Sequence, residues 1–107
     1  MPKHDPFAED IDDRLAALDG YRRRAMFGGH GLFQDKTFFG IVYRQRLYFR
    51  TTPATRAKYA AEGMGPLRYD AVHTMWNYYE VPATIFSEDD RLCEWAAEAI
   101  AARAEGE

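Results

Sequence analysis

The chain has 107 residues, of which 47% are hydrophobic, 15% aromatic and 29% charged. This length predicts one domain over residues 1–107, and the hydrophobic fraction excludes an intrinsically disordered chain. No apolar run is long enough to cross a membrane and the first residues lack the apolar stretch of a signal peptide, so we expect a cytoplasmic protein without a membrane partner. The single cysteine, Cys93, cannot form an internal disulfide, as is typical of a reducing compartment.

The net charge of −3 is unevenly distributed along the chain. Residues 21–58 contain nine Lys and Arg residues and one acid, Asp35, whereas the remainder contains five basic and sixteen acidic residues. Two interpretations are open. Acidic helices could neutralise a basic sheet within the protein, or the basic segment could bind a partner.

The N-terminal segment is predicted to form a helix over residues 6–19. Asp5 is a good N-cap, Pro6 suits the first helical position, and Gly20 ends the pattern. The apolar residues recur at helical spacing and would form one buried stripe: Phe7, Ile11, Leu15 and Leu18.

Residues 21–51 predict an antiparallel meander with tight turns at Asp35-Lys36 and Arg44-Gln45. The run from Thr37 to Tyr43 is apolar on both faces, which predicts a central strand covered on both sides. The next strand, residues 46–51, alternates between apolar and polar side chains. Its two faces carry Leu47 and Phe49 on one side and Arg46, Tyr48 and Arg50 on the other.

The second half of the chain predicts a helix over residues 53–62, a strand over residues 72–81 and a final helix over residues 87–104. Ser87 would cap the final helix in a box with Asp90. The resulting order, α-β-β-β-α-β-α, indicates an α+β fold. We expect a mainly antiparallel sheet of four to five strands, with helices at both ends and one between strands.

No group of residues forms a convincing catalytic or metal site, and we assign no catalytic residue, metal ligand or cofactor. The glycines around His30 lead into a strand, whereas phosphate-binding loops lead into a helix, so a bulge or tight connection is favoured. The only serine, Ser87, is explained as a helix cap, and neighbouring acids disfavour a Cys93 thiolate. Glu80 in a strand predicts a salt bridge with an arginine of the basic segment. A small enzyme that uses His30 or Glu80 is the third alternative.

The basic segment supplies a candidate interaction surface in which arginines alternate with aromatic residues. It consists of Arg22, Arg23, Arg24, Arg44, Arg46, Tyr48 and Arg50. A protein partner is the leading interpretation. Direct binding of nucleic acid is the alternative, because arginines neutralise phosphates and tyrosines stack on unpaired bases. A homodimer formed through an exposed sheet edge is also open.

Three motifs in order resemble the N-terminal domain of the TfoX/Sxy family. Residues 24–33 resemble its signature R-x-M-F-G-G-x-G-L-F, residues 46–50 are similar to its RLYLK strand, and residues 78–82 match its YYEVP block. The resemblance implies an α+β domain with an antiparallel sheet, and no catalytic residue or cofactor. It also implies a link to natural competence, in which the family acts with a transcription factor to raise expression of DNA-uptake genes.

The motif residues themselves are predicted to determine the fold, although a functional role for them stays open: Met26, Phe27, Gly28, Gly29, Gly31, Tyr78, Tyr79, Glu80 and Pro82. Glycines in the first motif would supply backbone angles that other residues resist. The competence regulators of the family carry a second, helical domain, whereas this sequence ends at Glu107, so we expect a stand-alone or an excised version.

Overall fold

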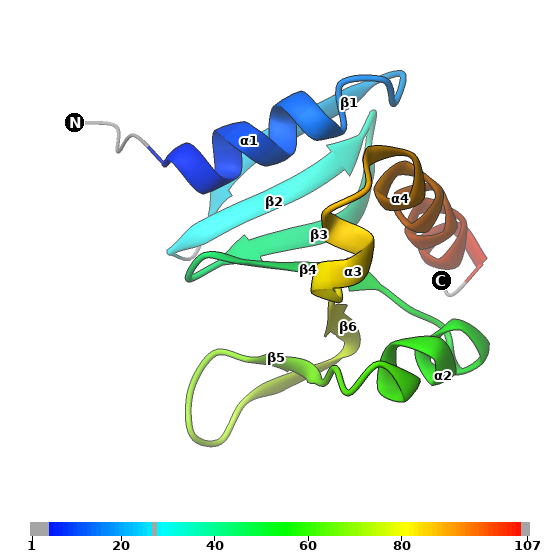
Figure 1. Cartoon of the computed structure of the whole chain (residues 1–107). Coiled ribbons are helices and arrows are strands. Elements are labelled where there is room, and N and C mark those ends of the chain that lie inside the picture. Colours follow the sequence, from blue (N-terminus) through cyan, green and yellow to red (C-terminus); the bar gives the residue numbers. More distant parts are fainter. Residues whose placement is uncertain (1–4, 27, 106–107) are drawn as a thin grey trace.

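The computed structural model describes residues 5–26 and 28–105, and Figure 1 shows the path of the chain. In chain order the elements are α1 (Pro6–Arg14), β1 (Tyr21–Met26), β2 (Gly29–Gln34), β3 (Thr37–Tyr43), β4 (Arg46–Arg50), α2 (Pro53–Ala61), β5 (Pro66–Arg68), β6 (Thr74–Glu80), α3 (Ala83–Phe86) and α4 (Asp89–Glu105).

The strands form one antiparallel sheet in the order β1-β2-β3-β4-β6-β5. This confirms the predicted α+β class, but the described sheet has six strands rather than four to five. The count was too low because the glycine-rich segment Gly29–Gln34 is a full strand, held by pairing with β1 and β3 on its two sides. The short segment Pro66–Arg68 also pairs with β6.

The two predicted tight turns are confirmed by their backbone angles. Asp35 has a φ of 54°, and Arg44 and Gln45 have φ of 51° and 66°. Two consecutive residues in the left-handed region fit the two-residue hairpin turn whose twist matches the strands on either side. These turns set the register of β3 against both of its neighbours.

Helix α1 is shorter than the predicted helix over residues 6–19. Asp5 caps it as expected, since its carboxylate accepts from the Ala8 N–H at 3.2 Å, but the helix ends at Arg14. Leu15 leaves helical geometry while remaining fully buried, and Leu18 packs against the core. The apolar pattern therefore continues past the end of the helix, which comes before the Gly20 signal.

The final helix also begins differently from the prediction. A four-residue helix, α3, precedes it, and the carbonyl of Pro82 accepts from the N–H groups of Ile85 and Phe86. Ser87 ends α3, where its hydroxyl donates to the Thr84 carbonyl at 3.3 Å. The predicted N-cap role of Ser87 with Asp90 is therefore wrong, because the turn of α3 already uses Ser87.

The helices α1, α3 and α4 lie over one face of the sheet, as Figure 1 shows. We call the apolar layer between them and the sheet the main core. Tyr59 of α2 joins it through an edge-to-face contact with Trp95 of α4, with ring centroids 4.7 Å apart. Its buried residues are Ala8, Ile11, Leu15, Leu32, Phe39, Val42, Leu47, Phe49, Tyr59, Val81, Ile85, Leu92, Trp95, Ala96 and Ala99.

A bulge between β2 and β3 determines which side of the sheet the central phenylalanines face. Leu32 pairs with Gly40 and Phe33 pairs with Phe38, so Phe39 is the additional residue. Phe39 is fully buried in the main core, whereas Phe38 packs on the opposite face. The predicted cover on both sides is found in part: helices cover one face, whereas on the other Ile41 is buried among strand residues and Phe38 is only half-buried.

The opposite face carries a second apolar cluster, whose members all come from strands, and we call it the helix-free cluster. Its buried residues are Ile41, Tyr48, Leu67 and Tyr78, and Phe38, Tyr43 and Met75 pack partly against them. Leu67 belongs to β5, three strands away from β3, a separation of about 14 Å in a flat sheet. The β5–β6 end of the sheet therefore bends towards the helix-free face.

Candidate interaction surface

A row of cross-strand neighbours places the basic segment relative to the two clusters. Arg24 pairs with Gly31, Gly31 with Ile41, Ile41 with Tyr48, and Tyr48 with Glu80. Residues directly opposite one another share a face of the sheet. Since Ile41 and Tyr48 belong to the helix-free cluster, this face also carries Arg24 and Glu80.

The arginines of β1 alternate between the two faces. Arg22 faces the helix-free side, where its guanidinium lies over the Phe33 ring at 5.2 Å and its Nε donates to the Asp35 carbonyl at 3.0 Å. Arg24 is exposed, and its side chain makes no hydrogen bond or ion pair with a described residue. Both guanidinium groups therefore lie on the helix-free face without a carboxylate partner among the described residues.

Arg23 lies on the helical side and is removed from the predicted surface. Its guanidinium lies 2.9 Å from the Asp12 carboxylate of α1, which also accepts from the Tyr21 hydroxyl at 2.8 Å. Lys58 is likewise paired with Glu98 of α4 at 2.8 Å. Carboxylates of the acidic helices thus neutralise the charges of Arg23 and Lys58 within the protein.

His30 belongs to the same network on the helical side. Its Nδ1 lies 2.9 Å from the Arg23 guanidinium and its Nε2 lies 3.3 Å from the Asp5 carboxylate. Because arginine only donates, Nδ1 accepts, and the proton on Nε2 faces Asp5. His30 thus joins β2 to the N-terminus of α1, an arrangement that gives it a structural role.

The Asp5 cap predicts a pH-dependent contribution to stability. Burial opposes ionisation, but the Ala8 N–H and the neighbouring His30 hold the pKa of Asp5 below its ordinary value. A carboxyl whose folded pKa is depressed stabilises the protein above its unfolded pKa, and this stability is lost as pH falls through the folded pKa.

We expect Asp5→Ala to lower the free energy of unfolding by about 0.5–2 kcal/mol at neutral pH. The loss should shrink as the pH falls below about 4. Urea titrations across this range measure it, with Asp13→Ala, an exposed position on the same helix, as the matched control. A loss that is independent of pH would contradict the charged role of Asp5.

The strand β4 contributes the predicted salt bridge to Glu80. Arg46 Nη1 lies 2.9 Å and 3.1 Å from the two carboxylate oxygens of Glu80. Such a solvent-exposed pair contributes at most about 1 kcal/mol, so its main effect is to hold the Arg46 head group over the sheet. Arg50 lies farther along the strand, with its guanidinium 5.7 Å from the centre of the Tyr78 ring.

The tyrosines of the candidate surface and of the YYEVP block are packing residues. Tyr48 is only 7% exposed and Tyr78 only 3%, both within the helix-free cluster. Tyr79 faces the main core, where its ring meets Tyr59 with centroids 6.2 Å apart. The block therefore joins both apolar layers, and Tyr48 offers no open ring for a base to stack on.

The glycines of the first motif occupy positions where a residue with a side chain would be strained or would clash. Gly28 has a φ of +78°, and a Cβ on Gly29 would lie 2.3 Å from the Val42 carbonyl oxygen. A Cβ on Gly31 would lie 2.9 Å from the Met26 sulfur, which packs over this position. The remaining motif residue, Phe27, lies outside the described residues.

A comparison with protein-family models matches the TfoX N-terminal domain over residues 13–103. The chain belongs to this family. The match includes all three motifs and nearly the whole sequence, so it confirms the resemblance. A search of curated proteins finds no match.

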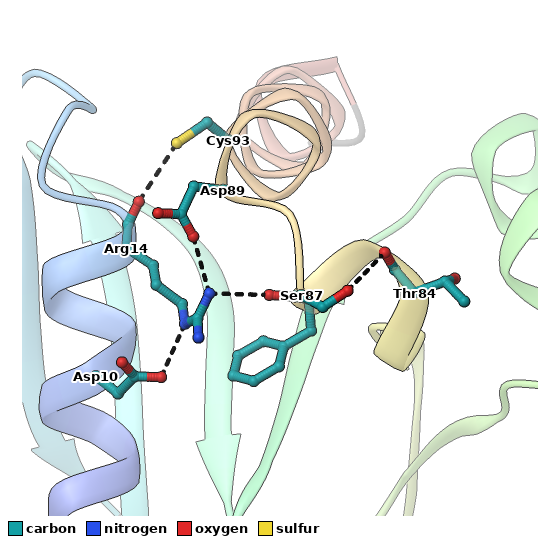
Figure 2. A network of polar contacts seen from close by, with 7 residues as sticks. Asp10, Arg14, Thr84, Ser87, Asp89 and Cys93 are labelled. Atoms are coloured by element: carbon teal, nitrogen blue, oxygen red, sulfur yellow. Dashed lines mark hydrogen bonds and ion pairs between the residues drawn. The ribbon is translucent and has the colours of Figure 1, made fainter.

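The single cysteine of this TfoX N-terminal domain contacts the end of α1 from α4, as Figure 2 shows. The Cys93 thiol donates to the Arg14 carbonyl oxygen at 3.5 Å. Burial raises the pKa of Cys93, and the negative charges of Asp89 and Asp90 add to this effect. The group is therefore a thiol at neutral pH, a poor nucleophile.

Arg14 makes the central polar contact of the same junction. Its Nε lies 2.8 Å from Asp10 within α1, and its Nη1 lies 2.8 Å from Asp89 of α4 and 3.3 Å from the Phe86 carbonyl of α3. These bonds explain how α1 is fixed to α3 and α4. The polar contacts of Arg14 near Ser87 thus connect α1 to α3 and α4.

Among residues 5–26 and 28–105, no cluster of three or more His, Cys, Asp or Glu side chains is able to hold a metal ion. None of the helices in this part of the chain combines the length and apolar character that a bilayer span requires.

Proposed function

We propose that this TfoX N-terminal domain is a regulatory or adaptor module that catalyses no reaction and binds a protein partner through the helix-free face of its sheet. The observation that carries the proposal is the position of exposed Arg22, Arg24 and Arg44 beside apolar side chains on a face that no described helix covers. The family relationship suggests regulation of natural competence as the process, with the transcription machinery as the class of partner.

The composition of this face supports a protein partner. Phe33, Phe38 and Tyr43 are half-buried there, so partner binding could remove further apolar area from water. Arginine and aromatic residues are enriched at protein interfaces, because each combines a large contact area with directed polar or cation–π contacts. Half of the exposed acids among the described residues lie on α1 and α4, on the other side of the sheet.

The double variant Arg22→Glu/Arg24→Glu tests the proposal. Reversal of two exposed charges should weaken the capture of partners from a lysate of the native cells, while the thermal unfolding temperature should stay close to that of the unmodified protein. Arg91→Glu, an exposed arginine on α4, is the matched control for charge reversal on the helical side. Quantitative mass spectrometry of the captured proteins provides the measurement. Capture that is equal for all three proteins would refute the proposal.

Direct binding of nucleic acid is the second candidate, supported by Arg22, Arg24 and Arg44, which have no described carboxylate partner. Phosphate contacts release counterions, so affinity would fall steeply between about 50 and 200 mM salt. Fluorescence anisotropy of a labelled single-stranded oligonucleotide at both salt concentrations separates the two functions. The protein-partner proposal expects no binding at either concentration.

A further inference from the structure

The end of the sheet beyond β4 contains an apolar pocket that the sequence motifs do not include. The pocket has a volume of about 250 Å³ and is lined by Tyr43, Leu67, Tyr69 and Met75. It forms because the β5–β6 hairpin bends towards the end of β3 on the helix-free face. In Figure 1 this hairpin, at the bottom of the molecule, lies away from α1 and α4.

We propose that this pocket binds a single large apolar side chain of an acidic peptide segment in the partner protein. This inference rests on the proposed function. It specifies the chemistry of the partner protein and one place on the domain that the partner contacts. Pockets for drug-sized molecules measure about 300–1,000 Å³, so this smaller volume suits one side chain better than a cofactor.

The hairpin that carries most of the pocket also carries exposed apolar residues, of which Tyr69 lines the pocket. Among the described residues, Tyr69, Val72 and Trp76 are the exposed large hydrophobic ones, at 45%, 82% and 61%. All three belong to the β5–β6 hairpin or its loop. A local concentration of exposed apolar side chains marks an interaction site, whereas scattered ones do not.

The charges beside the pocket favour an acidic peptide. Arg44 follows Tyr43, and its guanidinium lies 5.3 Å from the centre of the Tyr43 ring. Arg44 is exposed and makes no ion pair with a described residue. The nearby carboxylate of Asp70 is already engaged. It accepts from the N–H groups of Val72 and His73, both at 2.8 Å, and lies 2.7 Å from His73 Nδ1. The local surface therefore attracts a carboxylate-bearing segment.

One wall of the pocket is already ordered without a ligand. The Tyr69 ring stacks on the His73 ring with centroids 5.5 Å apart and an interplanar angle of 12°. The bonds from Asp70 fix His73 in turn. A preordered wall reduces the conformational entropy lost when a peptide binds.

A foreign peptide is favoured over a second copy of the chain. Half of the exposed acids that the structure describes lie on α1 and α4, while the pocket lies on the opposite face. A contact between these two different surfaces would be head-to-tail and would extend into open filaments unless it closed into a ring.

A displayed library of random linear peptides tests the inference. We expect selection on the unmodified protein to enrich peptides with a net negative charge and one large aliphatic or aromatic residue. Titration of a selected peptide should shift the NMR signals of Tyr43, Leu67, Tyr69 and Met75. Both Arg44→Glu and Tyr69→Ala should weaken its affinity about tenfold or more, whereas Arg91→Glu should leave it unchanged. Both altered positions are exposed, and circular dichroism checks that the variants fold.

Several results would overturn the inference. These are enrichment of neutral or basic peptides, no enrichment, signal shifts away from the pocket, or occupation of the pocket by an oligonucleotide or by a second copy of the chain. If selection fails while Arg22→Glu/Arg24→Glu still abolishes partner capture, the proposed function stands and the pocket has no part in it. If peptides bind the pocket while the double variant captures partners as well as the unmodified protein does, the pocket is a peptide site and the wider arginine surface is not the partner site.

Discussion

The variant Phe39→Ala is expected to lower the free energy of unfolding by about 3–5 kcal/mol, the range for removing a fully buried phenylalanine ring. Phe39 is 0% exposed, and its ring packs against Phe49 and Tyr21 with centroids 5.8 Å and 6.5 Å apart. The bulge in β3 directs this ring into the main core, so truncation leaves a cavity between the sheet and the helices. Urea unfolding followed by tryptophan fluorescence measures the loss.

The neighbouring variant Phe38→Ala is the matched control. Phe38 is half-buried on the helix-free face, so the same truncation should cost clearly less stability. Phe39→Leu should recover most of the loss, because it keeps much of the buried volume. An equal cost for the two alanine variants would mean that the bulge does not place the two rings as described.

The variant Gly29→Ala is expected to cost about 1–3 kcal/mol, the range for overpacking of a packed region. The added Cβ would lie 2.3 Å from the Val42 carbonyl oxygen, and a backbone atom in a paired strand has little room to move. Gly28→Asn is the control: the Gly28 backbone has a φ of +78°, and beyond its chain neighbours no atom of the described residues lies within 4 Å of an added Cβ. Asparagine tolerates this conformation. Chemical denaturation compares the two.

The same pair of variants separates a structural role of the glycine motif from a functional one. If the motif only determines the fold, Gly28→Asn should keep both its stability and its partner capture. Loss of capture with full stability would instead place Gly28 in the binding surface. The result would decide whether the first family motif belongs to the interface.

Local chemistry made some of these features predictable. Glu80 lies in a strand near a basic segment, and a half-buried acid there requires a cation, which Arg46 supplies. The turn at Arg44-Gln45 follows from polar residues between two apolar runs. The candidate surface instead grouped Arg23 with Arg22 and Arg24. Side chains alternate along a strand, and the position of α1 shows that Arg23 lies on the covered face.

Other features depend on contacts between distant segments. Gly29–Gln34 has little strand propensity of its own and forms β2 because strands pair with both of its edges. The helix α3 has four residues, too few for an apolar period, and it exists because Pro82 starts it and Ile85 is buried. The pocket combines residues from β3 with residues of the β5–β6 hairpin, so no local pattern could reveal it.

The acidic helices α1 and α4 lie on one side of the sheet and the exposed Arg22 and Arg24 on the other, so the charge is unevenly divided between the two faces. In the field of a negatively charged partner such a molecule experiences a torque before any contact forms, and it turns its arginine side forward. The gain is in the association rate, because fewer encounters occur in unproductive orientations. The rate enhancement should decline once the Debye length, about 8 Å at physiological ionic strength, is shortened further by added salt.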